Sequence, residues 1–132
     1  MMFNKKVEKM NLNDFLEFND EIELNILVKK LINGKPHKNI RIEVAIESLL
    51  RSLIYYVYSI KPKEERTLKQ VVVEIDLSQS LIENKDYFVD KLENFPIDHP
   101  ARIYWREVSC LKQDEIKECF KIAKDRIKSK TK

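Results

Sequence analysis

Residues 47–73 read ESLLRSLIYYVYSIKPKEERTLKQVVV, a long apolar segment that ends at a proline and is followed by a charged turn. Its apolar side chains recur at i, i+3, i+4 and i+7, which predicts a helix over residues 42–59. Pro62 ends this helix, and Thr67 with Gln70 forms a capping-box pattern that begins another. The expected buried stripe of the long helix is Ile46, Leu49, Leu50, Leu53, Ile54 and Val57.

The composition of the whole chain favours helices over sheets. Of its 132 residues, 43% are hydrophobic and 36% are charged, which is enough for one core and a solvated exterior. Gly34 is the single glycine, whereas tight hairpins, phosphate-binding loops and nucleophile elbows all depend on glycine. We therefore expect an all-α fold, a compact bundle of six or seven helices with a long central helix.

The N-terminal part predicts one further helix within a single domain of residues 1–132. Residues 1–19 are expected to be a partly ordered lead-in, and residues 20–128 the helical bundle. Asp20 is a suitable N-cap for the first helix, which should end near Ile32. Its inward-facing residues are expected to be Ile22, Ile26 and Leu27.

The C-terminal part predicts several shorter helices. The valine-rich segment after residue 67 fits a helix but also has strand propensity, and a short separate element is expected over residues 77–82. A helix is expected over residues 85–95, followed by helices capped by Asp98 and by Asp114. The last helix should bury Ile116, Cys119, Phe120, Ala123 and Ile127.

The cysteines and histidines do not form a recognisable metal or disulfide pattern. Cys110 and Cys119 lie nine residues apart, which fits reduced thiols, with Cys119 filling the core. His37 and His99 stand beside prolines and lack partners at metal-ligand spacing, so we expect no metal and no cofactor. The longest apolar run, residues 53–58, is far shorter than the roughly 20 residues of a membrane helix, so no membrane insertion is expected.

Three segments also carry a resemblance to a known family. Residues 48–58 contain Leu-Leu-x-x-Leu-Ile-x-Tyr, residues 61–68 contain Pro-x-Glu-Glu-x-Thr-Leu, and residues 98–105 begin a Tyr-bearing helix that precedes the one after Asp114. In this order they resemble the all-alpha domain of type IV secretion coupling proteins, the TraG/TraD-type DNA-pumping ATPases of bacterial conjugation. The resemblance covers roughly residues 20–128.

The resemblance implies a non-catalytic recognition domain. In the family, this domain sits on a hexameric motor and helps to select the relaxase, its attached DNA and the relaxosome accessory proteins. The motor binds ATP through a glycine-rich loop that this chain lacks. The resemblance thus implies a helical domain excised from a larger ATPase, cytoplasmic and in contact with its membrane-anchored parent motor. A freestanding helical protein-interaction or regulatory module is the alternative.

Two basic clusters are candidate nucleic-acid contacts. One is a ridge on the last helix, spaced three or four residues apart, which would follow a phosphate backbone or form an ordinary solvated face. It consists of Lys117, Lys121, Lys124 and Lys128. The other is Arg102 and Arg106 beside Trp105, suited to phosphate forks and base stacking. Alternatively, Trp105 plugs the edge of the core while the arginines pair with Asp98 or Glu107.

An acidic segment is the candidate protein contact. Its charges would receive a basic helix or tail of a secretion substrate, or would simply be solvated. The candidate residues are Glu83, Asp86, Asp90 and Glu93. No nucleophile context or carboxylate pair suited to acid–base chemistry stands out, so no catalytic residue is predicted.

Overall fold

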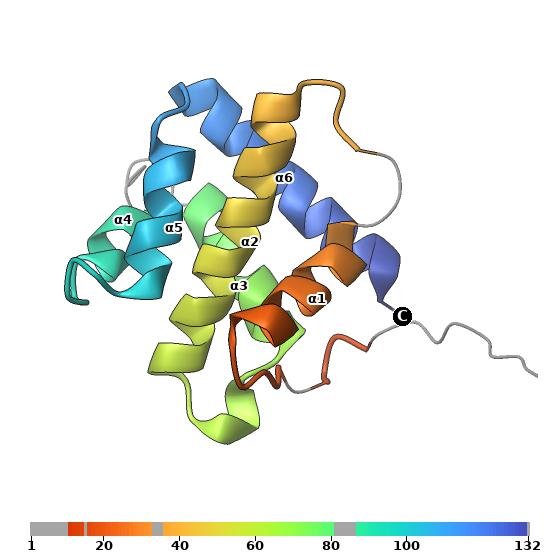
Figure 1. The fold of residues 1–132 in the computed structure, drawn as a ribbon, viewed down its shortest axis with the longest axis vertical. Coiled ribbons are helices and arrows are strands. Elements are labelled where there is room, and N and C mark those ends of the chain that lie inside the picture. Colours follow the sequence, from red (N-terminus) through yellow and green to blue (C-terminus); the bar gives the residue numbers. More distant parts are fainter. Residues whose placement is uncertain (1–10, 15, 33–35, 81–86, 132) are drawn as a thin grey trace, which may run out of the picture.

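The computed structural model describes residues 11–14, 16–32, 36–80 and 87–131. The described part is all-helical, as predicted, with α2 running through the middle, α5 on one side of it and α1 on the other (Figure 1). The elements in order are α1 (Glu21–Ile32), α2 (Ile40–Ile60), the short 3-10 helix η1 (Lys63–Glu65), α3 (Leu68–Ser80), α4 (Tyr87–Leu92), α5 (Pro100–Ser109) and α6 (Gln113–Lys130).

Helix α2 is the hub of the bundle and packs against α1, α3, α5 and α6, most extensively against α5. It begins two residues earlier than predicted because the Asn39 side chain caps it, accepting a hydrogen bond from the Arg41 backbone N–H at 2.9 Å. It ends before Pro62, as predicted. The whole predicted stripe from Ile46 to Val57 is fully buried, so the periodicity of this segment located the core correctly.

Helix α3 settles the choice between helix and strand in favour of a helix. The Thr67 hydroxyl accepts a hydrogen bond from the Gln70 backbone N–H at 3.3 Å, and Val71 and Ile75 are buried below it. The helix then runs without interruption to Ser80. The separate element predicted over residues 77–82 is therefore wrong for residues 77–80, which belong to α3. Residues 81 and 82 lie outside the described part. The segment contains neither proline nor glycine to stop it.

Helix α1 ends at Ile32 and is capped by Asp20, both as predicted: the Asp20 carboxylate accepts from the Glu23 N–H at 3.0 Å. Its predicted inner face is wrong for Ile22 and Ile26, whereas Leu27 is partly buried and packs against the core as predicted. Ile22 and Ile26 are 70% and 53% exposed, whereas the buried residues are Leu24, Val28 and Leu31. This helix is apolar on two sides, and periodicity alone does not say which side meets α2 and α6.

Two other predicted caps are also corrected. His99, not Asp98, caps α5, since its Nδ1 accepts from the Ala101 N–H at 3.1 Å. Helix α6 begins after Lys112, whose backbone N–H donates to Glu115 Oε1 at 3.1 Å, and Asp114 lies within the first turn.

The remaining predicted segments are shorter or better packed than expected. Helix α4 covers only Tyr87–Leu92, with Phe88 and Leu92 buried, and a turn follows it; residues 85 and 86 lie outside the described part. In the expected lead-in, Leu16 is buried and its N–H donates to the Arg66 carbonyl at 2.6 Å. Phe18 lies against the rings of Tyr55 and Tyr58.

The described helices include none with the length and apolar character needed to span a bilayer.

Candidate functional site

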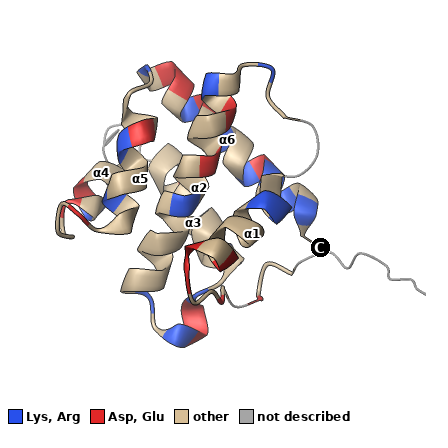
Figure 2. Cartoon of the chain, viewed as in Figure 1, with Lys and Arg blue, Asp and Glu red and all other residues tan. Residues whose placement is uncertain are grey.

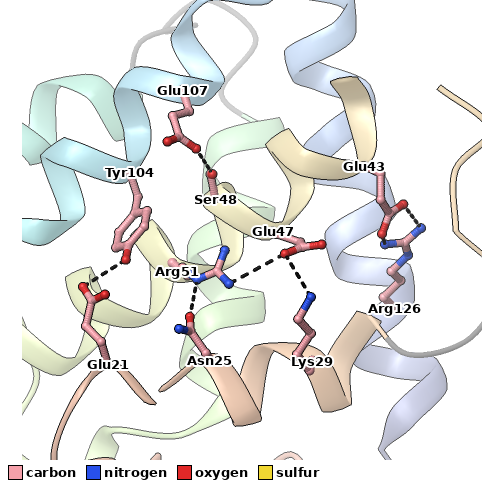
Figure 3. Close-up of polar contacts among 10 residues, drawn as sticks. All are labelled: Glu21, Asn25, Lys29, Glu43, Glu47, Ser48, Arg51, Tyr104, Glu107 and Arg126. Atoms are coloured by element: carbon pink, nitrogen blue, oxygen red, sulfur yellow. Dashed lines mark hydrogen bonds and ion pairs between the residues drawn. The ribbon is translucent and has the colours of Figure 1, made fainter. Parts of the chain in front are cut away.

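A layer of polar side chains fixes α2 to its neighbours on the face seen in Figure 3. Glu43 at the start of α2 receives two hydrogen bonds from the Arg126 guanidinium of α6, at 2.6 and 2.8 Å. Both side chains are only 13% exposed. The hydrogen bonding by Arg126 lowers the pKa of Glu43 despite the opposing effect of burial. The pair therefore stays charged and ties the two longest helices together.

Arg51 and Glu47 extend this layer from α2 to α1. The Arg51 Nε donates to the Asn25 side-chain oxygen at 2.8 Å, and its Nη2 lies 3.6 Å from Glu47. Glu47 also lies 3.8 Å from the Lys29 ammonium group. Glu47 and Arg51 are thus both compensated within the molecule (Figure 3).

Two contacts attach α5 to the same layer. The Ser48 hydroxyl donates to Glu107, and the Tyr104 hydroxyl donates to Glu21 at 2.9 Å. Burial, followed by the interaction with the Glu21 carboxylate, raises the pKa of Tyr104 to about 12, so this hydroxyl remains a donor at neutral pH. The Tyr104 ring stacks on Tyr55 with centroids 6.1 Å apart.

Two open depressions flank the N-terminal half of α2. The α1–α2 depression, about 720 Å³, is lined by Ile22, Asn25, Ile26, Lys29, Lys30, Ile32, Pro36, Glu43 and Glu47. The α2–α5 depression, about 460 Å³, is lined by Ile40, Arg41, Val44, Ala45, Glu107, Cys110 and Leu111. Both are shallow and open, with mainly apolar floors.

Large apolar side chains stand exposed at these depressions. Ile40 and Val44 are 75% and 50% exposed at the α2–α5 depression, and Ile22 and Ile26 are 70% and 53% exposed at the α1–α2 depression. Exposed apolar side chains that gather beside a rigid polar frame suit contact with another macromolecule better than they suit an enclosed small ligand. The surface of α1, α2 and α5 is therefore the candidate functional site.

Comparison of the chain with known protein families, curated proteins and solved structures finds no match.

The predicted lysine ridge on α6 is only partly available to a partner. Lys117, Lys121 and Lys128 are exposed, as a nucleic-acid contact requires. Lys124 is half-buried, and its ammonium group lies 2.6 Å from the Asp76 carboxylate of α3. This lysine therefore helps to hold α6 against α3.

The second basic cluster braces the turn that precedes α5. Arg102 donates to the Phe95 carbonyl at 3.0 Å, and Arg106 donates to the Ile97 carbonyl at 2.9 Å. These partners are backbone carbonyls and not the predicted carboxylates of Asp98 or Glu107. Trp105 meets the rings of Phe88 and Phe120 at centroid distances of 5.4 and 6.1 Å, so the interpretation that it plugs the edge of the core is confirmed.

Only two of the four acidic candidates lie in the part of the chain that the structure describes. Asp90 on α4 and Glu93 just after it are exposed, whereas Glu83 and Asp86 lie outside the described residues. Glu74, from the same acidic stretch of sequence, is only 4% exposed and accepts a hydrogen bond from the Tyr87 hydroxyl at 3.2 Å. Burial is the main cause that raises the pKa of Glu74.

The exposed isoleucines and Val44 were missed as site residues. Ile22 and Ile26 satisfy the spacing of a core stripe, so the sequence pattern assigned them to the interior. The available signal was the second stripe on the same helix, Leu24, Val28 and Leu31. A short helix with two apolar stripes has more apolar surface than one core contact requires.

Proposed function

We propose that this chain is a non-catalytic recognition domain of the conjugative coupling-protein type, which docks the relaxase or a relaxosome accessory protein for delivery to a secretion channel. The observation that carries the proposal is the exposed apolar surface at the α2–α5 depression, held on a rigid frame of paired charges. Ile40 and Val44 project there without apolar cover among the described residues. Such a surface offers a partner apolar area without the cost of ordering a loop.

The order of the elements supports the coupling-protein part of the proposal. The three resembling segments correspond to α2, to the turn η1 leading into α3, and to α5 followed by α6. The family's features are packing and capping signals. These segments pack on the core of this chain and the Thr67 cap is present, whereas Asp98 and Asp114 do not cap α5 and α6. Relaxase, accessory protein and the parent motor domain are the proposed partners.

The three exposed lysines of α6 support a contact with DNA as part of the same role. Each neutralised phosphate of a single strand contributes about 0.7 to the slope of log K against log salt. We expect single-stranded DNA to bind with a salt slope that falls by about 2 when Lys117, Lys121 and Lys128 are replaced by alanine. Lys124→Ala is the matched control, since its charge is engaged by Asp76.

The test for the docking role is a binding titration of this chain with the relaxase and the accessory protein of its own conjugative element. We expect saturable binding that Val44→Glu weakens at least about tenfold, because a charge replaces a contact at the centre of the surface. Ile97→Glu is the control, since Ile97 is also exposed but lies outside both depressions. No saturable binding to relaxase, accessory protein or DNA would reject the proposal.

A loss of partner binding on Asp90→Lys and Glu93→Lys, with binding by Val44→Glu unchanged, would move the docking site to the acidic surface.

Genomic context gives an independent check. A reading frame that continues into ATPase motifs agrees with the coupling-protein role, whereas a self-contained frame favours a freestanding helical module.

A further inference from the structure

The outward ridge of α1 is apolar over its N-terminal half. Ile22 and Ile26 are one helical turn apart and are exposed by 70% and 53%. The opposite side of the same helix is already buried through Leu24, Val28 and Leu31. Since α1 meets the bundle with that opposite side, Ile22 and Ile26 lie outside the described core.

The charges on α1 are separated along its axis. Acidic residues Glu21 and Glu23 occupy the first turn, and basic residues Lys29 and Lys30 occupy the last turn, which Figure 2 shows as red and blue ends of the helix. Glu23 and Lys30 are seven residues apart and therefore lie on the same flank of the ridge. Neither forms an ion pair with another described side chain, although Glu23 accepts a hydrogen bond from the Asn19 N–H.

This pattern is complementary to itself when a second copy is turned end to end. In an antiparallel pair related by a two-fold axis, the side of α1 that carries Glu23 and Lys30 faces the same side of the other copy's α1. The N-terminal end of each helix then lies beside the C-terminal end of the other. Ile26 then meets Ile26 of the other copy near the axis, and Glu23 lies opposite the other copy's Lys30. A parallel pair would instead place like charges side by side.

The neighbouring α1–α2 depression gives the second helix a place to lie. Its far wall carries Glu43 and Glu47, and both carboxylates are already paired, with Arg126 and with Lys29 and Arg51. An approaching apolar side chain therefore does not leave an uncompensated charge behind. Ile22 and Ile26 themselves form part of the wall of this depression, together with Ile32, and an apolar ridge that borders a hollow suits interdigitation of two helices.

We propose that α1 is a self-association helix through which two copies of this chain pair antiparallel. A second copy of this chain is the expected partner, because α1 itself has every feature that a helix complementary to this surface needs. These features are an apolar ridge, an acidic first turn and a basic last turn. The dimer uses a different surface from the α2–α5 depression, so it does not depend on the proposed docking role.

The first test is the oligomeric state of the full chain by sedimentation equilibrium over a wide concentration range. We expect a reversible dimer whose dissociation constant rises at least about tenfold on Ile26→Glu, because two carboxylates would meet at the axis. Ile103→Glu is the matched control, since Ile103 is exposed on α5 outside both depressions. Thermal unfolding of each variant checks that the bundle is retained.

The second test is a charge exchange. Glu23→Lys and Lys30→Glu should each weaken the homodimer by placing like charges opposite one another, and an equimolar mixture should form a heterodimer in which both opposite-charge pairs are restored. A native chain that stays monomeric at every concentration overturns the proposal. A dimer that is indifferent to Ile26→Glu, or variants that fail to recover on mixing, overturns it equally. A helix from another protein that binds α1 while the chain stays monomeric would identify a different occupant.

Discussion

Glu43 and Arg126 lie 83 positions apart in the sequence and form a two-pronged ion pair between α2 and α6. The pair closes the edge of the bundle next to the α1–α2 depression and supports one wall of it. Its geometry, with two short hydrogen bonds from one guanidinium, is the arrangement that gives an arginine–carboxylate pair most of its strength.

Replacing Arg126 by methionine should lower the free energy of unfolding by about 1–3 kcal/mol, because a mostly buried carboxylate loses its charged hydrogen bonds. Denaturant unfolding at neutral pH measures this. Arg41→Met is the control: Arg41 is mostly exposed and lies 3.5 Å from Glu115, so its loss should cost less than about 1 kcal/mol. Equal effects of the two substitutions would contradict the importance of the Glu43–Arg126 pair.

The Glu43–Arg126 pair should also make the stability of the fold depend on pH in the acidic range. The pKa of Glu43 is lower in the folded chain than the ordinary value of 4.5. Its stabilising contribution is therefore fully present above that ordinary value and is lost as the pH falls through the lower folded value. Glu43→Gln should flatten the decline in unfolding free energy in that acidic range. An unchanged slope would show that the decline arises elsewhere.

For Glu74 we expect a pH dependence of stability that is opposite in sign to that of Glu43. Burial raises the folded pKa of Glu74 above 4.5, so its favourable state is the protonated one, and stability is lost as the pH rises from 4.5 through the folded value. Glu74→Gln keeps an acceptor for the Tyr87 hydroxyl and removes the buried charge. We expect this variant to be at least as stable as the native chain at neutral pH. The matched control is Glu64→Gln in η1, where the side chain is exposed and no change is expected. A clear loss of stability in Glu74→Gln would count against this interpretation.

A third effect of pH on stability is expected at the start of α5, where His99 caps the helix. Its Nδ1 must be unprotonated to cap the helix, and burial lowers the pKa of His99 below 6.5. Its contribution is therefore present above pH 6.5 and is lost as the pH falls through the folded value. His99→Ala should cost about 0.5–2 kcal/mol at pH 8. His99→Asn should retain most of the cap and remove this pH dependence, as thermal or denaturant unfolding at several pH values would show.

The two cysteines should differ sharply in their reactivity. Cys110 is exposed at the end of α5, whereas Cys119 is buried in α6 and burial raises its pKa to about 11. A maleimide or iodoacetamide reagent at mildly alkaline pH should modify Cys110 within the folded chain and reach Cys119 only after unfolding. Peptide mass spectrometry identifies the modified residue. Rapid modification of Cys119 under native conditions would contradict its place in the core.

The strongly periodic segments determined the fold class and the hub. In α2, an unbroken stripe over several turns left one face that could enter the core, and Ile46 to Val57 are buried as a result. The predicted stripe of α6 is likewise buried from Cys119 to Ile127, with Ile116 only partly buried, because charged residues occupy most of the rest of the helix surface. Proline and the Thr67 cap marked the turn between α2 and α3 through local backbone chemistry, which needs no distant partner.

Tertiary structure decided everything that depends on a partner far away in the sequence. Helix α1 has two apolar stripes, and only its contact with α2 and α6 selects Leu24, Val28 and Leu31 for the core. Lys124 belongs to a regular lysine ridge, yet Asp76 on α3 removes it from the free surface. Sequence spacing fixes which side chains share a face of one helix. Which face is covered, and which charge is compensated, depends on how the other helices pack against it.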